Sequence, residues 1–278
     1  MYDERGMPDH RFVFVGGLHR SGTTLLGRCL ADHPLVSGLS GTGVPADEGQ
    51  HVQSVYRPAK AYGGPGRFAF SPEAHLTEDS PLVSGESRER ILAEWSPYWD
   101  LERPYLLEKS PPNLIRMRFL QALFPTALFV VVTRHPIAVS YATRKFRTRA
   151  QRFRRRMGLR HLLRHWVVAH RLFQEDEPYL ENLIVVRFER LIREPDACLR
   201  DVYDHLGIEA LPTQREMRPG SNERYFERWR EEARSPSGGA TLELRREFEA
   251  EVRELGYSLE DLDFVADGYA RPSVGTRA

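Results

Sequence analysis

RFVFVGGLHRSGTTLLGRCL, residues 11–30 of the chain, joins a short apolar run to an amphipathic segment through a turn that contains Gly17 and Gly22. The run Phe12 to Val15 predicts a buried strand, and the segment 22–32 predicts a helix. A glycine-rich turn before a helix directs several backbone N–H groups toward one point and adds the positive end of the helix dipole. The stretch therefore predicts a binding site for a phosphate or sulfate group.

The spacing of the two glycines matches the nucleotide-binding P-loop, but Thr23 and Thr24 follow where that loop has Lys-Ser/Thr. Arg20 lies inside the loop instead, and its guanidinium can bind phosphate oxygens through two hydrogen bonds. Without the lysine that reaches the β and γ phosphates, the pattern disfavours ATP and GTP as ligands. The residues expected to hold the anion are Gly17, His19, Arg20, Ser21, Gly22, Thr23 and Thr24.

Apolar and amphipathic segments alternate along the chain. The predicted strands are Phe12 to Val15, Tyr105 to Leu107, Leu128 to Thr133 and Leu183 to Phe188, and helical patterns lie over 22–32, 113–124, 137–147, about 153–174 and 196–205. This alternation predicts an α/β fold in which helices cover both faces of a mostly parallel sheet. Ligands of such sheets bind at the carboxyl ends of the strands, which is where Gly17, Lys109 and Arg134 would lie together.

The remaining segments are less regular. Residues 36–77 are rich in Gly, Pro and polar side chains and predict a long active-site loop. A hinge is expected at 235–239, before a last helix over 242–255. With 278 residues and 41% hydrophobic side chains, the chain fits one domain that spans residues 1–278.

Lys109 lies just past the end of the second predicted strand, in a chain that has lysine only at positions 60, 109 and 145 and uses arginine elsewhere. A compact cation at the edge of the sheet can contact a departing oxygen during group transfer. The preference for arginine also indicates a GC-rich, bacterial genome.

Charge and cysteine content limit the other function classes. The formal net charge is +1, but no Asp or Glu occurs from Lys109 to Gln174. This basic stretch predicts a surface for anionic ligands, and a solvated arginine-rich helix is the alternative. No nucleic-acid motif accompanies it. Cys29 and Cys198 are too few for a disulfide framework and have no metal-ligating neighbours. No apolar run is long enough for a signal core or a membrane span, so we expect a cytoplasmic protein.

The loop GGLHRSGTTLL, residues 16–26, resembles the 5′-phosphosulfate loop of sulfotransferases that use PAPS (3′-phosphoadenosine 5′-phosphosulfate). Its R-S-G-T-T-L form is most similar to protein-tyrosine sulfotransferases and their bacterial relatives. The resemblance implies the three-layer, P-loop-NTPase-like fold. It also implies in-line transfer of a sulfuryl group from PAPS to a hydroxyl, without a metal, which leaves PAP as the product.

A second motif, LEKSPPN at 107–113, resembles the E-K-S/T-P sequence of heparan sulfate sulfotransferases and, at Lys109, the K-T-H-L-P of cytosolic ones. Pro111 stands where the cytosolic enzymes have their catalytic histidine, so the base must come from elsewhere. Tyrosine sulfotransferases use a Glu from the loop after their first helix, and Glu48 lies in the corresponding region. Asp47 and His51 are the alternatives.

A third motif, TRHPIAVSY at 133–141, resembles the 3′-phosphate signature R-D/N-P-x-x-x-x-x-S, and Arg134 matches its arginine. The serine position falls on Ala142. Thr143 is about one third of a turn from it on a helix and Ser140 about half a turn, so Thr143 is the favoured substitute donor. Lys145 could add charge.

The end of the chain carries looser similarities. Residues 185–208 resemble the family's late strand and helix, and residues 218–229, RPGSNERYFERW, predict a loop that closes over the nucleotide, with Ser221 matching a family serine. The acceptor is left open among a glycan, a small molecule, a lipid and a tyrosine, with basic residues favouring an acidic or carbohydrate acceptor. A P-loop kinase or NTPase acting on ATP and a non-enzymatic basic binding module are the competing interpretations.

Overall fold

The computed structural model describes residues 10–145, 157–235 and 238–266. Its centre is a parallel sheet whose strands lie in the order β2-β3-β1-β4-β5. Their bounds are β1 Arg11–Gly17, β2 Val36–Gly38, β3 Tyr105–Lys109, β4 Leu128–Thr133 and β5 Leu183–Arg187. Four of these strands were predicted from the sequence. The three residues of β2 are too few to show a strand pattern.

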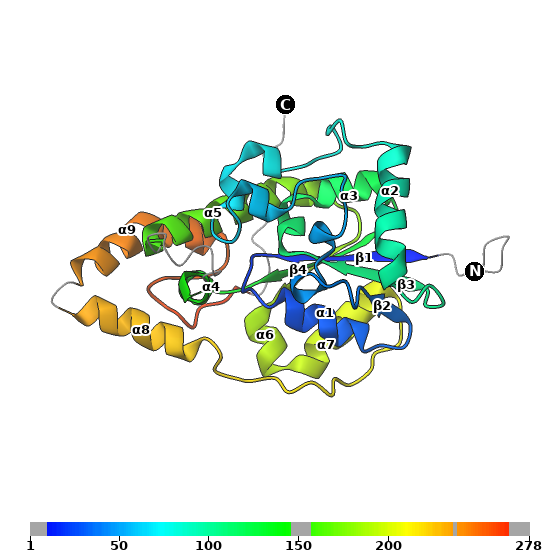
Figure 1. The fold of residues 1–278 in the computed structure, drawn as a ribbon. Helices are drawn as coiled ribbons and strands as arrows, with labels where there is room; N and C mark the ends of the chain where they lie inside the picture. The colour runs from blue at the N-terminus through cyan, green and yellow to red at the C-terminus, as the bar shows by residue number, and fades with distance from the viewer. Residues whose placement is uncertain (1–9, 146–156, 236–237, 267–278) are drawn as a thin grey trace, which may run out of the picture.

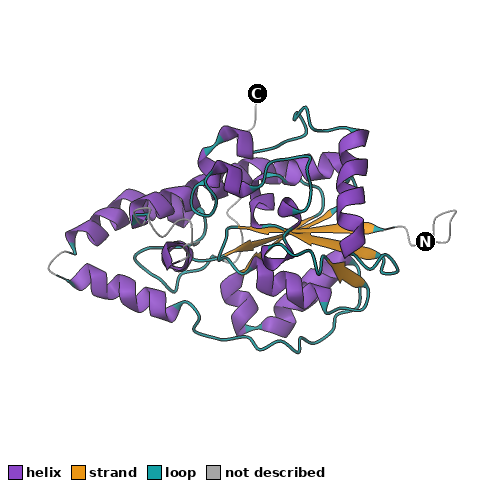
Figure 2. Cartoon of the chain, viewed as in Figure 1, coloured by secondary structure: helices purple, strands orange, loops and turns teal. Residues whose placement is uncertain are grey.

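Helices cover both faces of the sheet (Figure 2), as predicted. One face packs on α1 (Thr23–Ala31), α6 (Phe188–Arg193) and α7 (Pro195–Leu206). The other packs on α2 (Gly85–Trp95), α3 (Met117–Leu123), α4 (Pro136–Lys145) and α5 (Leu159–Asp176). Because side chains alternate along a strand, Phe12 and Phe14 enter one core while Val13 and Val15 enter the other. The α/β, three-layer architecture is therefore confirmed.

Two further helices extend beyond the sheet (Figure 1): α8 (Glu223–Arg234) and α9 (Gly239–Glu254). The predicted loop over 218–229 is therefore wrong from residue 223 onward, because Tyr225, Phe226 and Trp229 are buried on one side of a helix. The predicted hinge at 235–239 includes residues outside the described part. The predicted helix over 113–124 is divided, since a 3₁₀ turn at Pro111–Ile115 precedes α3.

Helix α9 lies along α5 and neutralises part of the basic stretch. Arg160 pairs with Glu247 at 2.8 Å, Arg164 pairs with Glu251 at 3.1 Å, and Arg171 pairs with Glu254. These three arginines thus belong to a charged contact between α5 and α9. The arginines at 154–156, and the first residues of the helix expected over 153–174, lie outside the described residues.

The register of the sheet brings the predicted site residues to one edge. Val15 is paired with Lys109 and Gly17 with Val132, so the ends of β1, β3 and β4 are level. No helix in the described part of the chain is long and apolar enough to cross a membrane.

Candidate active site

The turn between β1 and α1 has the geometry of an anion-binding loop. Gly22 caps α1 with φ of 110°, and a Cβ atom there would collide with the ring of Phe188. Arg20 adopts φ of 75°, which is uncommon for a non-glycine residue. The first amides of α1 therefore point out of the turn, since the first N–H groups of a helix have no partner within it.

These amides open onto a pocket of about 460 Å³. The described residues that line it include four cations and no acid: Arg20, Gly22, Thr23, Thr24, Arg134, Ala142, Lys145, Arg224 and Tyr225. The volume is in the range of pockets that bind small molecules and cofactors. The sequence-predicted Arg20 and Arg134 thus line the same pocket, which favours a ligand with more than one anionic group.

Arg134 is held in place by three hydrogen bonds. Its Nε donates to Oδ1 of Asn222 at 2.9 Å, Nη1 donates to the main-chain oxygen of Arg20 at 2.9 Å, and Nη2 donates to that of Ser221 at 3.3 Å. Its guanidinium carbon also lies 4.1 Å from the centre of the Phe188 ring. Burial lowers the pKa of this guanidinium, and Glu189 opposes the shift.

Glu189 orients the side chain of Asn222, which accepts a hydrogen bond from Arg134. One of its oxygens, Oε1, accepts hydrogen bonds from Asn222 Nδ2 at 2.7 Å and from the amide of His135 at 3.0 Å. The other, Oε2, accepts a hydrogen bond from the Tyr257 hydroxyl at 3.2 Å. The segment after β4, helix α6 and the C-terminal region therefore converge on this one arginine.

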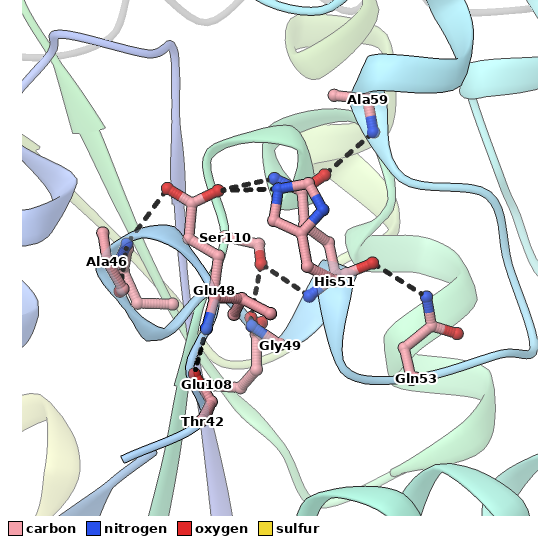
Figure 3. Close-up of polar contacts among 12 residues, drawn as sticks. Thr42, Ala46, Glu48, Gly49, His51, Gln53, Ala59, Glu108 and Ser110 are labelled. Atoms are coloured by element: carbon pink, nitrogen blue, oxygen red, sulfur yellow. Dashed lines mark hydrogen bonds and ion pairs between the residues drawn. The ribbon is translucent and has the colours of Figure 1, made fainter. Parts of the chain in front are cut away.

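Lys109 and Glu48 form an ion pair at the end of β3. Lys109 Nζ lies 3.2 Å from Glu48 Oε1 and donates to the main-chain oxygen of Ala46 at 3.1 Å. The second carboxylate oxygen of Glu48 accepts a hydrogen bond from Gln50 Nε2 at 2.6 Å and lies 3.8 Å from His51 Nε2. Figure 3 shows the Glu48 side chain between Ala46 and His51. Both partners of the ion pair are less than 10% exposed, at 6% and 8%.

The other two candidate bases have different surroundings. Asp47 Oδ1 accepts hydrogen bonds from the amide of Thr42 at 3.0 Å and from the hydroxyl of Thr42 at 2.6 Å. The Asp47 carboxylate therefore closes the turn over residues 42–47. His51 is near Glu48 but not paired with Lys109, and burial lowers its pKa while Glu48 opposes the shift. Among the three candidates, Glu48 alone is ion-paired to Lys109 in the described structure.

A second, narrower pocket of about 80 Å³ lies along the Lys109 side chain. Its walls come from one face of α1, from β3 and from the loop before Glu48, and they include Thr24, Gly27, Ala31, Leu39, Ala46, Asp47 and Lys109. Thr24 lines both this pocket and the larger one. The anion loop is therefore the junction between the cationic pocket and the Lys109 side of the site.

Ser140 and Thr143 face away from the cationic pocket. They line a cavity of about 10 Å³ together with His19, Gly66 and His165. Ala142 and Lys145 lie three residues apart, on one face of α4, and that face is the one that meets the pocket. A role for Thr143 or Ser140 at a 3′-phosphate stays a prediction, and this placement does not favour it.

The remaining predicted residues support the loop. His19 packs near Phe68, with ring centres 5.7 Å apart, and burial lowers its pKa to about 4. Ser21 is 1% exposed beneath the turn. Ser221 contributes its main-chain oxygen to Arg134, while its hydroxyl donates to the main-chain oxygen of Arg218.

Sequence reasoning missed three residues of the C-terminal segment, Asn222, Arg224 and Tyr225. Arg224 and Tyr225 line the cationic pocket, and Asn222 accepts a hydrogen bond from Arg134. Arg224 donates to the Tyr225 hydroxyl at 2.8 Å, and Lys145 Nζ lies 5.3 Å from the centre of the same ring. The basic and aromatic residues of the segment were the signal that could have identified them.

The comparisons with known proteins concern the family of the chain. A family model described as "Sulfotransferase family" matches residues 13–212. An uncharacterized protein of Aquifex aeolicus (strain VF5) is 27% identical over 207 residues, which are 72% of this chain and 26% of that protein. The chain thus spans about a quarter of the length of this relative.

Similar solved structures have low identities and scores. The sulfotransferase domain of the Synechococcus PCC 7002 olefin synthase is 16% identical with a TM-score of 0.48, over 89% of this chain and 98% of that chain. A sulfotransferase from Alicyclobacillus acidocaldarius is 15% identical with a TM-score of 0.46, over 88% and 96% of the two chains. One from Mycobacterium tuberculosis is 16% identical with a TM-score of 0.48, over 88% and 78%. Since these TM-scores are below 0.5, family membership rests on the sequence model, which covers most of the chain. On that match, the chain belongs to the sulfotransferase family.

Proposed function

We propose that the protein transfers a sulfuryl group from PAPS to a hydroxyl group of an acceptor. The observation that carries this proposal is that Arg20 and Arg134 line one pocket of about 460 Å³. PAPS has two anionic ends, a 5′-phosphosulfate and a 3′-phosphate, and a pocket with cations at two places suits such a molecule.

The two ends of the pocket differ in their donors. The α1 amides, Arg20, Thr23 and Thr24 would hold the 5′-phosphosulfate, since hydroxyl, amide and guanidinium donors all meet there. Arg134, Lys145 and Arg224 would hold the 3′-phosphate. On this assignment, Lys145 of α4 and Arg224 of α8 provide positive charge near Ala142, a position at which α4 offers no hydroxyl.

When bound, PAPS supplies a sulfur atom that carries a phosphate leaving group. The S–O bond to that phosphate breaks as the acceptor oxygen bonds to sulfur, and PAP departs. Lys109 neutralises the charge that develops on the departing oxygen. Glu48 takes the proton of the acceptor hydroxyl, and its ion pair with Lys109 holds the two groups 3.2 Å apart before the reaction.

The acceptor would reach this ion pair from the side of the loop over 38–47. The narrow pocket along Lys109 lies there and meets the cationic pocket at Thr24. A glycan, a small molecule, a lipid or a tyrosine can each present the required hydroxyl. The exposed Arg28, which lines this narrow pocket, favours an acidic or carbohydrate acceptor.

Thermal unfolding with nucleotides tests the proposal. PAP, ADP and ATP are each added with and without magnesium, and a ligand at 100 times its Kd stabilises the folded state by about 2.7 kcal/mol. We expect PAP to raise Tm most, equally with and without magnesium. A preference for ATP with magnesium would show a kinase or NTPase, and no response to any nucleotide would leave a basic binding module. Transfer of label from [³⁵S]PAPS to a panel of hydroxyl acceptors then tests the reaction itself.

A further inference from the structure

Glu108 is a buried carboxylate directly before Lys109, and it is 0% exposed. Its Oε1 accepts hydrogen bonds from the amide of Gly49 at 2.9 Å and from the Ser110 hydroxyl at 2.5 Å. Its Oε2 accepts a hydrogen bond from Asn113 Nδ2 at 2.6 Å. Burial raises the pKa of Glu108, and a buried carboxyl group is retained only where several hydrogen-bond partners satisfy it, so this group needs a structural or functional reason.

The bonds of Glu108 reach the segment that carries Glu48. Gly49 directly follows Glu48, and its amide is fixed by the carboxylate of Glu108. The next amide, that of Gln50, donates to the Ser110 hydroxyl at 3.0 Å. A Cβ atom on Gly49 would lie 2.5 Å from Cγ of Glu108, so glycine is required for this close approach. Figure 3 shows Glu108 and Ser110 against this segment.

The three consecutive residues Glu108, Lys109 and Ser110 thus all bind the same loop. Alternate side chains of a strand point to opposite faces, so Glu108 and Ser110 share one side and Lys109 has the other. Lys109 binds the Glu48 carboxylate, while Glu108 and Ser110 bind the two peptide groups that follow Glu48. Gln50, whose amide is held in this way, donates through its side chain to Glu48 Oε2.

We propose that Glu108 is a positioning residue that fixes the proposed base Glu48 beside Lys109 through the amide of Gly49. The inference rests on the proposed function, because it assigns Glu108 a role in the same reaction. Glu108 itself does not reach the reacting atoms. It lies under the loop, among the residues of β3 and of the turn at Pro111–Ile115.

A double-mutant cycle tests this role. Glu108→Ala, Glu48→Gln and the double variant are compared for kcat in sulfuryl transfer and for PAP affinity. A misplaced catalytic group costs on the order of a hundredfold in rate, so we expect Glu108→Ala to lower kcat by about that factor. PAP affinity should stay within about twofold of wild type, because Glu108 lies outside the cationic pocket. The double variant should be about as slow as Glu48→Gln alone, since the two residues act as one unit.

Two further variants keep the test decisive if Glu108→Ala does not fold. Glu108→Gln retains an oxygen that accepts the Gly49 amide, so it should recover most of the lost kcat. Ser110→Ala removes the bond to the Gln50 amide and should lower kcat by a smaller factor, again only when Glu48 is present. A matched control is Glu94→Ala. The carboxylate of Glu94 also binds a loop residue, since it accepts a hydrogen bond of 2.7 Å from the amide of Ser54. It does not bind the peptide groups that follow Glu48, so kcat should not change in this variant.

The outcomes separate the two proposals. Absence of transfer by the wild-type protein would refute the proposed function. If the wild type transfers the sulfuryl group but the losses of kcat caused by Glu108→Ala and Glu48→Gln multiply in the double variant, the positioning role alone would be overturned. A fall in PAP affinity parallel to the fall in kcat would also overturn it, because it would show a general structural defect.

Discussion

The guanidinium of Arg134 donates a hydrogen bond of 2.9 Å to the main-chain oxygen of Arg20. Arg20 has φ of 75°, a conformation that costs a non-glycine residue on the order of 1–2 kcal/mol. The bond therefore helps to hold a strained residue of the anion loop. It also joins the end of β4 to the turn after β1, so that the two ends of the cationic pocket form one unit.

Arg134→Ala should weaken binding at both ends of the pocket. The variant loses a charge and also the support of Arg20, and a charge-assisted hydrogen bond contributes about 1.5–3 kcal/mol, or roughly 10–100-fold in affinity. We expect calorimetry to show this loss for PAP and a clear loss for 5′-AMP, which has no 3′-phosphate. Unchanged 5′-AMP affinity would contradict the coupling. Arg90→Ala, an exposed arginine of α2 paired with Glu86, is the control.

Lys145→Ala should weaken the binding of PAP but not that of 5′-AMP, because we assign Lys145 to the 3′-phosphate alone. The lysine is exposed and its charge is screened, so the expected loss is about three- to tenfold and smaller at high salt. Ala142→Ser should restore a similar amount in the Lys145→Ala background, since it returns a hydroxyl to the face of α4 that lines the pocket. An equal loss of 5′-AMP affinity would argue against this assignment.

Lys109→Ala and Arg20→Ala should each slow sulfuryl transfer by about a hundredfold or more, the size typical of one lost transition-state contact. Their effects on PAP binding should differ. Arg20 lines the cationic pocket and Lys109 does not, so only Arg20→Ala should also weaken the binding of PAP. Single-turnover rates and PAP titrations separate the two steps, and wild-type turnover by either variant would refute its assigned role.

The protein should lose stability as the pH falls below about 6.5. Burial lowers the pKa of His135, His165 and His170 to about 3, and these histidines stay neutral in the folded state. In the unfolded chain they bind protons near pH 6.5, so each one reduces the free energy of unfolding by about 1.4 kcal/mol per pH unit between that value and about pH 3.

Two of these histidines need a neutral ring nitrogen as acceptor. His165 Nε2 accepts a hydrogen bond from the amide of Ala69 at 3.3 Å, and His135 Nδ1 accepts one from that of Ile137 at 3.2 Å. Urea unfolding at pH 7 and pH 5 should show the loss, and His165→Gln should flatten the dependence on pH. A slope identical to that of the wild type would show that His165 is not a source of the acid sensitivity.

Local sequence patterns were sufficient for four of the five strands of the sheet and for the residues that meet at its edge. The apolar run before Gly17, the glycine spacing and the polar turn specify strand, loop and helix within twenty residues. Lys109 ends a buried strand and Arg134 directly follows one. In a parallel sheet such positions must meet at one edge. These parts were predictable because they depend on neighbours in the sequence.

The tertiary structure decided what depends on distant segments. Glu48 is paired with Lys109 across 61 residues, and Arg134 is held by Asn222 across 88 residues. The face of α4 that meets the pocket carries Ala142 and Lys145 instead of Ser140 and Thr143, and this follows from the packing of α4 on its neighbours. Periodicity records which residues share a face of a helix, but not what that face will contact, because the contact is set by how the whole chain buries its apolar surface.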